Sequence, residues 1–212
     1  MADIAWRRQI PSMNDDPVDV LLRTERMILR RFTSADLDDL VALDSDPEVM
    51  RFLTNGRPTA YEMVRDDVLP RILAEYERSP RHGRWAATDT GTGRFLGWFS
   101  LARPDHDDLD EANLGYRLRR EVWGRGLATE GARALVAAAF IGLGLRRVFA
   151  TTMAVNLASR RVMEKAGLRY VRTFHLEFDD PIPGTEHGEV EYAVTADEWR
   201  RTRETDAGGG AG

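Results

Sequence analysis

Two glycines, Gly124 and Gly126, stand where a strand-like run ends and an Ala-rich helical pattern begins, in the stretch EVWGRGLATEG. The first N–H groups of a helix lack intrahelical partners, and that end of the helix carries about half a unit of positive charge. Glycines remove Cβ atoms where backbone would approach phosphate oxygens, while small Ala128 and the hydroxyl of Thr129 keep the helix start open. The pattern predicts an anion site, to which Arg125 can add a contact. A tight strand-to-helix turn is the alternative interpretation.

Two nucleotide-binding motifs do not fit this turn. The GK[ST] sequence of a P-loop is missing, and Thr129 stands where GxGxxG requires Gly or Ala. The dinucleotide-binding fold also needs an acidic residue about 20 positions further on, and RRVFATTMAVN offers none. An enzyme that uses ATP or NAD is therefore disfavoured.

Composition limits the class of protein. The chain has 212 residues, 42% of them hydrophobic, so a single α/β domain is the simplest arrangement. Its formal net charge of −5 argues against a surface that grips nucleic acid, since Lys and Arg dominate phosphate binding. No apolar run approaches the roughly 20 residues of a membrane span, and the N-terminal MADIAWRRQI lacks the apolar segment of a signal peptide. We expect a cytoplasmic protein with no nucleic-acid or membrane partner.

Metal and thiol chemistry are also disfavoured. Cysteine is absent, which excludes disulfides, thiolate metal sites and thiol nucleophiles. The four histidines, His82, His106, His175 and His187, are scattered without HExxH or paired-ligand spacing, so no metal site is expected. Lys165 is the only lysine, and we interpret the Arg-dominated composition as that of a GC-rich bacterial genome.

The predicted elements place the glycine turn between a strand and the most clearly helical segment of the chain. The spacing predicts strands at 26–32, 84–88, 94–102, 112–120, 146–155, 168–178 and 189–195, and helices at 33–45, 60–79, 128–143 and 156–166. Thr33 or Ser34 caps the first helix, and Pro70 kinks or divides the second. A right-handed crossover makes strands 112–120 and 146–155 parallel. We expect a flexible segment at 1–20, one domain at 21–202 and a flexible Gly-rich tail at 203–212.

Four stretches together resemble one family. They are LRTERMILRRF, LGYRLRREVWGRGLATEG, NLASRRVMEKAGL and EVEYAVTADEW, in this order and spacing over about residues 22–200. In them the chain resembles the GNAT superfamily of acetyl-CoA-dependent N-acetyltransferases, and within it the Rim-type (RimJ/RimL-like) branch. The resemblance implies a mixed α/β sheet whose fourth and fifth strands are parallel and splay apart, leaving a slot for the pantetheine arm of acetyl-CoA.

The resemblance also implies the cosubstrate contacts. In the superfamily's pyrophosphate motif, Gln/Arg-x-x-Gly-x-Gly/Ala, the fixed positions are here Trp123, Gly126 and Ala128, with Trp replacing the usual first residue. The Leu118 N–H is available to the thioester carbonyl. The residues expected to contact CoA are Leu118, Arg119, Trp123, Gly124, Arg125, Gly126, Leu127, Ala128, Thr129, Asn156, Ser159 and Arg161.

The catalytic residues depart from the usual pattern of the superfamily. Asn113 stands where members often place a Glu, and Met163 stands where many place a Tyr that acts as the general acid. Glu111, on the same strand face as Asn113, is the candidate base, with a solvated strand-end charge as its alternative role. Asn156 and Ser159 match the Asn-x-x-Ser of the branch, and Ser159 is the candidate to protonate or hydrogen-bond the thiolate. The alternative is that Asn156 is only a helix N-cap and Ser159 an exposed helix residue.

The acceptor is the open part of the prediction. The resemblance implies a primary amine, either a protein N-terminal α-amine or a small-molecule amine, and the branch includes homodimers. The acidic run DHDDLDE (105–111) either attracts a cationic amine or is a solvated loop. The segment FDDPIPGTEHG (178–188) either shapes the acceptor pocket or is a surface loop. A non-catalytic acyl-CoA-binding sensor or pseudoenzyme is the alternative function.

Overall fold

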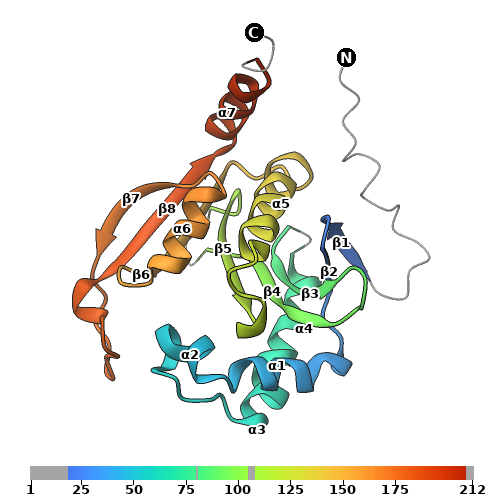
Figure 1. The fold of residues 1–212 in the computed structure, drawn as a ribbon, viewed down its shortest axis with the longest axis vertical. Helices are drawn as coiled ribbons and strands as arrows, with labels where there is room; N and C mark the ends of the chain where they lie inside the picture. The colour runs from blue at the N-terminus through green and yellow to red at the C-terminus, as the bar shows by residue number, and fades with distance from the viewer. Residues whose placement is uncertain (1–18, 80, 105–107, 209–212) are drawn as a thin grey trace.

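Eight strands form one mixed sheet in the computed structural model, which describes residues 19–79, 81–104 and 108–208 (Figure 1). The strands are β1 (Val20–Arg23), β2 (Met27–Arg31), β3 (Gly83–Asp89), β4 (Phe95–Ala102), β5 (Glu111–Leu118), β6 (Arg147–Met153), β7 (Arg169–Phe174) and β8 (Glu189–Thr195). The helices are α1 (Leu37–Asp44), α2 (Pro47–Thr54), α3 (Tyr61–Met63), α4 (Leu69–Arg78), α5 (Leu127–Ile141), α6 (Leu157–Lys165) and α7 (Ala196–Gly208). Short turns of 3-10 or π-helix are η2 (Ser34–Asp36), η3 (Val64–Val68), η4 (Arg120–Val122) and η5 (Thr185–His187).

The sheet has the order β1-β2-β3-β4-β5-β6-β8-β7. The predicted α/β class and mixed sheet are confirmed: β5 and β6 are parallel, and the other neighbours are antiparallel. β5 and β6 are the fourth and fifth of the predicted strands, because β1 was not expected. Residues 1–18 and 209–212, parts of the segments expected to be flexible, lie outside the described residues, and α7 runs on to Gly208.

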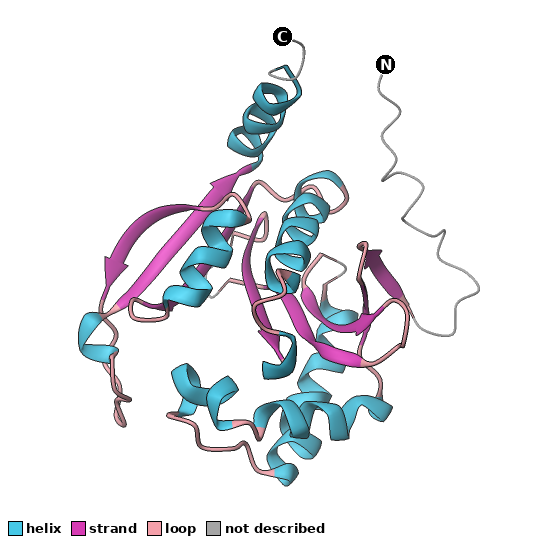
Figure 2. Cartoon of the chain, in the orientation of Figure 1, coloured by secondary structure: helices cyan, strands magenta, loops and turns pink. Residues whose placement is uncertain are grey.

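Helices cover both faces of the sheet (Figures 1 and 2). The larger core joins the sheet to α5 and α6, and the smaller core joins β3 and β4 to α1, α2 and α4. Seven of the eight β4 residues are buried for this reason. α5 lies very close to the sheet at Gly131, where a Cβ atom would fall 2.6 and 2.7 Å from two ring carbons of Phe99. Glycine is therefore required there for the helix to pack at this distance.

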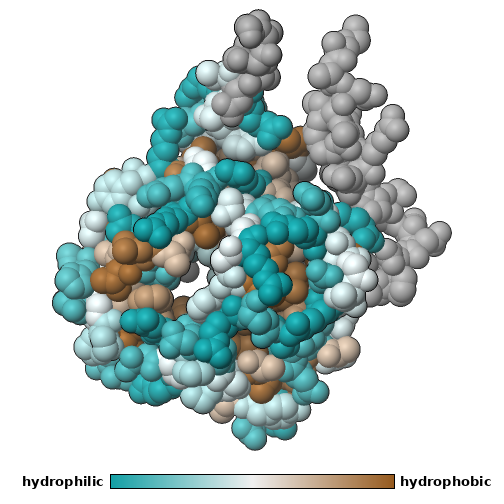
Figure 3. All heavy atoms as spheres, viewed as in Figure 1, coloured by the Kyte–Doolittle hydropathy of each residue, from teal (hydrophilic) through white to brown (hydrophobic). Residues whose placement is uncertain are grey.

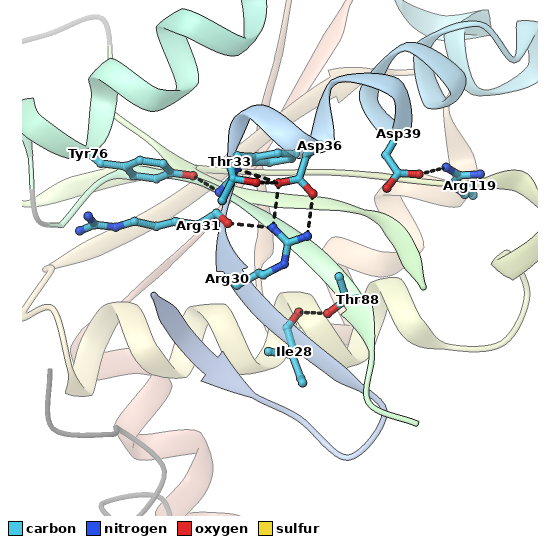
Figure 4. A network of polar contacts seen from close by, with 10 residues as sticks. Ile28, Arg30, Arg31, Thr33, Asp36, Asp39, Tyr76, Thr88 and Arg119 are labelled. Carbon is cyan, nitrogen blue, oxygen red and sulfur yellow. Dashed lines mark hydrogen bonds and ion pairs between the residues drawn. The ribbon is translucent and has the colours of Figure 1, made fainter. Parts of the chain in front are cut away.

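The helical layer that contains α1 begins at η2, whose N-cap is Thr33, one of the two predicted caps. The carboxylate of Asp36 accepts hydrogen bonds from the Thr33 N–H (2.7 Å) and from the guanidinium of Arg30 on β2 (Figure 4). Burial alone would raise the pKa of Asp36, but the hydrogen bonds from Arg30 and Thr33 outweigh it and lower that pKa. α1 is thus tied to the sheet at its first turn.

Helix α2 was not predicted, although the sequence carries its signals. Asp46 caps it by accepting the Glu48 N–H at 2.9 Å, and Pro47 occupies its first position. It ends at Asn55, whose φ of 56° is left-handed, followed by Gly56. The predicted helix around 60–79 is continuous through the π-helical turn η3, which ends two residues before Pro70. Within the described part of the chain, no helix is both long and apolar enough to cross a membrane.

Candidate active site

Strands β5 and β6 separate partway along their length. Their pairing joins Glu111, Ala112 and Asn113 to 147–149 and ends there, although β5 runs on to Leu118 and β6 to Met153. The predicted splay of this parallel pair is therefore confirmed. It leaves a paired end, at the start of both strands, and an open end, where β5 leads into the glycine turn.

The open end presents backbone N–H groups to the gap. The Arg119 N–H donates to the Leu96 carbonyl of β4 at 2.9 Å, so Leu118 and Gly97 form a non-hydrogen-bonded pair of the antiparallel ladder. The alternation of that ladder turns the N–H groups of Leu118 and Tyr116 away from β4 and towards β6. Leu118 thus has the orientation that its expected contact with a thioester carbonyl requires.

Trp123 supports this strand end. Its indole Nε1–H donates to the Leu118 carbonyl at 2.8 Å, while the side chain is 46% exposed. The tryptophan at the first position of the pyrophosphate motif therefore fixes the backbone beside the gap. The sequence indicated the position of Trp123 but not this contact.

The glycine turn is left-handed at both glycines and leaves room for a ligand. Gly124 has φ 73° and Gly126 has φ 78°, values that L side chains rarely adopt. A Cβ at Gly124 would meet no atom within 4 Å, and one at Gly126 would meet only Arg26 Nη2, at 3.7 Å. Gly126 is the N-cap of α5, and no side chain caps the helix. Backbone conformation, rather than crowding by this chain, thus explains the two glycines.

The first residues of α5 expose backbone rather than side chains to the turn. The Leu127 side chain is buried in the larger core, and Ala128 and Thr129 are half-buried. The first N–H of α5 to bond within the helix is that of Glu130, to the Gly126 carbonyl at 3.0 Å. The amides of the three residues before Glu130 have no such intrahelical partner and remain for an anion.

Arg26 clamps the turn from the start of β2. Its Nη1 donates to the Arg125 carbonyl at 2.8 Å, and its Nε donates to Glu130 Oε2 at 2.7 Å. Burial would raise the pKa of Glu130, but hydrogen bonds from Thr24 and Arg26 outweigh it and lower that pKa. No local pattern in the sequence indicates this contact, because Arg26 and Arg125 are 99 positions apart.

The arginines expected to contact CoA lie in different surroundings. Arg119 is directed elsewhere: its guanidinium pairs with Asp39 on α1 (Figure 4). Its backbone N–H is bonded to the Leu96 carbonyl of β4. Arg125 and Arg161 are exposed, beside the turn and on α6. Of the three side chains, Arg119 is therefore the one whose expected contact has least support.

Asn156 and Ser159 lie together at the start of α6. Asn156 is the N-cap: its Oδ1 accepts the Ser159 N–H at 3.2 Å, and its Nδ2 donates to Thr152 Oγ1 at 3.2 Å. The Ser159 hydroxyl lies 2.9 Å from the hydroxyl of Tyr116 on β5, which also contacts the Ser159 carbonyl at 3.0 Å. Burial raises the pKa of Tyr116 to about 12, so its hydroxyl stays protonated. The sequence placed Tyr116 on a strand face but did not connect it with Ser159.

Glu111 lies at the paired end and is bound to an arginine. Its Oε2 accepts from Arg147 Nη1 at 2.7 Å, and Arg147 also binds Glu191, which is bound in turn by Arg172 of β7. The Oε2 of Glu111 is thus occupied by a guanidinium and is not left for an amine. The geometry therefore favours a structural role for Glu111 over that of a base. The role is that of an ion pair with Arg147 and not of a solvated strand-end charge.

The described part of the acidic run 105–111 is neutralised in the same way. Arg146 pairs with Asp108 and Asp110, and Arg81 donates to Asp110 at 2.9 Å. Residues 105–107 lie outside the described residues. The run therefore offers less free negative charge to an amine than its sequence suggests.

A groove of about 460 Å³ lies between α2 and the loop that joins β7 to β8. Its lining residues are Arg51, Phe52, Asn55, Val155, Pro183, Gly184 and His187. Figure 3 shows a hollow with apolar surface on its rim on this face of the molecule. Arg57 pairs with Asp180 at 2.6 Å, so the segment after α2 and the predicted acceptor loop meet. The volume suits a small molecule or the end of a peptide.

Comparisons with known proteins agree with this geometry. The sequence model described as acetyltransferase (GNAT) domain matches residues 26–169. The chain is 38% identical over 187 residues to the FsC-acetyl coenzyme A-N(2)-transacetylase of Aspergillus fumigatus, covering 85% of this chain and 78% of that protein.

Solved structures share the fold. RimL, a ribosomal alpha-N-protein acetyltransferase in complex with coenzyme A, superposes with a TM-score of 0.71 and 16% identity, covering 85% of this chain and 99% of that one. Spermidine N-acetyltransferase from Vibrio cholerae, in complex with CoA and spermine, gives a TM-score of 0.68 and 15% identity, with 84% and 99% covered.

Proposed function

The chain belongs to the GNAT acetyltransferase family, and we propose that this N-acetyltransferase transfers the acetyl group of acetyl-CoA to the α-amine of a small molecule or peptide held in the groove beside α2. The observation that carries this proposal is the separation of β5 from β6 directly before a glycine turn that opens a helix. In this proposal the gap between β5 and β6 receives the thioester of acetyl-CoA, and the glycine turn receives its diphosphate.

The relatives support an α-amine acceptor. The relative with 38% identity is named for acetyl transfer to an N(2) nitrogen, and one structural neighbour is named for transfer to a protein α-amine. An α-amine has a pKa near 8, whereas a lysine amine is near 10.4. Deprotonation at pH 7 therefore costs about 1.4 kcal/mol for the former and about 4.6 kcal/mol for the latter. An α-amine places the smaller demand on the enzyme.

In the proposed complex the amides of Leu127, Ala128 and Thr129 bind the diphosphate, with Gly124 and Gly126 giving close access. Exposed Arg125 and Arg161 add phosphate contacts, and Trp123 holds the end of β5. The pantetheine arm then lies along the open edge of β5, where Leu118 donates its N–H to the thioester carbonyl.

Transfer then follows by direct attack. The neutral amine attacks the carbonyl carbon, the new C–N bond forms and the C–S bond breaks. The ammonium formed in the intermediate loses its proton, and the departing thiolate gains one. Ser159, held by Tyr116 and by the Asn156 cap, is the proposed donor of a proton or hydrogen bond to the sulfur, and Asn156 is a positioning residue.

The proposal is tested by measuring release of free CoA from acetyl-CoA with a panel of amines. The panel contains amino-acid amides, short peptides with free N-termini, and spermidine, and acetyl-CoA affinity is measured in parallel by calorimetry. We expect turnover to be fastest with α-amines. Binding without turnover on every amine would instead favour an acyl-CoA sensor, and stronger thermal stabilisation by ATP or NAD than by CoA would overturn the CoA site.

A further inference from the structure

Glu189, the first residue of β8, has surroundings unlike those of the other carboxylates on its side of the sheet. It is half-buried, and within the described parts of the chain no hydrogen-bond or ion-pair partner accompanies its side chain. Two residues on, Glu191 is bound by both Arg147 and Arg172. Glu189 is thus a carboxylate kept partly from water without a cation beside it.

The register of the sheet places Glu189 near the open end. It lies opposite Met153, the last residue of β6, and opposite Phe174 of β7. Arg147 contacts both Glu111 and Glu191, so these two carboxylates share one face of the sheet, and Glu189 shares it with Glu191 by alternation. Tyr192, the next residue on β8, points to α6 on the other face. Glu189 and Glu191 therefore lie on the face of the sheet away from α6.

The groove lies over the same face. A Cβ at Gly184 would fall 2.7 Å from Val155 Cγ2 and 3.2 Å from Met153 Cε, so the loop before β8 is folded against the end of β6. Gly184, Val155 and His187 line the groove, and His187 is two residues from Glu189. Glu189 is not itself a lining residue, but it lies on the face of the sheet that the groove covers, next to the loop that lines it.

We propose that Glu189 is the general base for the acceptor, taking a proton from the ammonium group of an α-amine bound in the groove. This inference rests on the proposed function and gives the proton-accepting role to Glu189 rather than to Glu111. An ammonium ion is also the complement of a carboxylate without its own cation, so the same group attracts and then deprotonates the acceptor.

The proton transfer is balanced within the reaction already described. The Glu189 carboxylate and the acceptor ammonium give a carboxylic acid and a neutral amine, which attacks the thioester. The proton on Glu189 then leaves to solvent. Burial raises the pKa of Glu189, which brings the carboxylate closer to the amine in basicity and makes the transfer less costly.

Several charged or titratable groups lie near Glu189. Arg51 of α2 lines the same groove, with its guanidinium carbon 5.3 Å from the centre of the Phe52 ring, and His175 lies beside Gly188, where a Cβ would fall 3.1 Å from its Nε2. On its own strand Glu191 is bound to two arginines, and on β7 Arg172 is one of them. In the preceding loop His187 and Glu186 lie 3.5 Å apart. From β6 the opposing residue is Met153, which does not titrate.

The test compares Glu189→Gln with wild type by the pH dependence of kcat/KM, using the best α-amine of the panel. At pH 7 we expect a loss of about 100-fold. The deficit should shrink as the pH rises above the pKa of the amine, because the acceptor then arrives neutral. Glu189→Asp should recover part of the activity, and acetyl-CoA affinity should be unchanged. Glu77→Gln, the same change on the exposed face of α4, is the control.

Each remaining outcome has a distinct meaning. A deficit that is constant with pH, or an unchanged kcat/KM, would overturn the role of Glu189 while leaving the proposed function intact. If Glu111→Gln instead removed the pH-dependent limb, the base would be Glu111. If wild type acetylated no amine of the panel, the proposed function itself would fail, and this inference with it.

Discussion

The two ends of the β5–β6 pair differ in how their polar groups are satisfied. At the paired end, Arg147 binds Glu111 and Glu191, and the strands are joined by backbone hydrogen bonds. At the open end, the Leu118 N–H faces the gap, and no side chain in the described ranges caps α5 or forms an ion pair with Glu189. The paired end completes its interactions within the chain, whereas the open end leaves groups for ligands.

This difference suggests a division of roles. A buried ion pair that is complete resists the exchange of partners and fixes the register of the strands. Hydrogen-bond donors and carboxylates that have no partner within the chain lower the stability of the free protein. A ligand that binds them stabilises the folded state. Substitutions at the open end should therefore change affinity or rate, and substitutions at the paired end should change the free energy of unfolding.

The largest expected effect is at the glycine turn. Gly126→Val adds a branched side chain at φ 78° and fills the space next to the free amides of α5. We expect acetyl-CoA affinity, measured by calorimetry, to fall by about 100-fold, which corresponds to losing one or two charge-assisted hydrogen bonds.

Gly144→Val is the matched control for Gly126→Val. Gly144 has φ 69° and, like Gly124, has no atom within 4 Å of a Cβ position, but it follows the opposite end of α5. It should lose stability from backbone strain and keep its affinity for acetyl-CoA. Equal loss of affinity in both variants would show that strain, not the site, is responsible.

Next in size is the hydroxyl pair between β5 and α6. Ser159→Ala should lower kcat by about 10- to 100-fold with little change in acetyl-CoA affinity, because it removes the proposed proton or hydrogen-bond donor to the thiolate. Tyr116→Phe should give a smaller loss of kcat, since it keeps the Ser159 hydroxyl and removes only its neighbour, which contacts the Ser159 hydroxyl at 2.9 Å and the Ser159 carbonyl at 3.0 Å. Steady-state kinetics separate the two parameters, and unchanged turnover in Ser159→Ala would exclude Ser159 from the reaction.

At the paired end we expect a loss of stability. Arg147→Met leaves Glu111 without the arginine that binds it and Glu191 with Arg172 alone, and should lower the free energy of unfolding by about 3 kcal/mol, measured by urea denaturation at pH 7. Arg200→Met removes an exposed pair with Asp197 and should cost less than about 1 kcal/mol.

The same variant carries a pH dependence with a defined sign. Burial would raise the pKa of Glu191, but hydrogen bonds from Arg172 and Arg147 outweigh it and hold that pKa below its ordinary value of 4.5. A lowered carboxylate pKa stabilises the fold above pH 4.5, and this contribution is lost as the pH falls through the lowered value. Wild type should therefore lose more stability on acidification below 4.5 than Arg147→Met does. Parallel losses would contradict this account.

The smallest effect is expected at Trp123. Trp123→Phe keeps the aromatic ring and removes the indole N–H that binds the Leu118 carbonyl at 2.8 Å. The KM for acetyl-CoA should rise a few-fold, in line with one neutral hydrogen bond. Trp199→Phe, where the indole packs against Phe140 and away from the site, is the control.

The sequence was most informative where function depends on local backbone. The glycine turn, the start of α6 at Asn156 and the strand β5 all follow from residues next to one another in the chain, because turns and caps are local. The α/β class follows from the order of strands and helices.

The partners of side chains were not predictable in the same way. Arg26 reaches the turn from 99 residues away, and Tyr116 meets Ser159 across 43 residues, so no spacing rule identifies either contact. Glu111 and Glu189 look alike in sequence as strand-end carboxylates. Only the fold separates them, by giving Arg147 to the first.

The attachment of Arg26 to the turn also links two segments that lie far apart in the sequence. The β1–β2 hairpin lies at the edge of the sheet, yet its arginine holds the Arg125 carbonyl from behind. Occupancy of the turn by a cosubstrate should therefore slow hydrogen exchange at hairpin amides such as that of Arg26. The first strands of the chain would in this way report whether the thioester is bound.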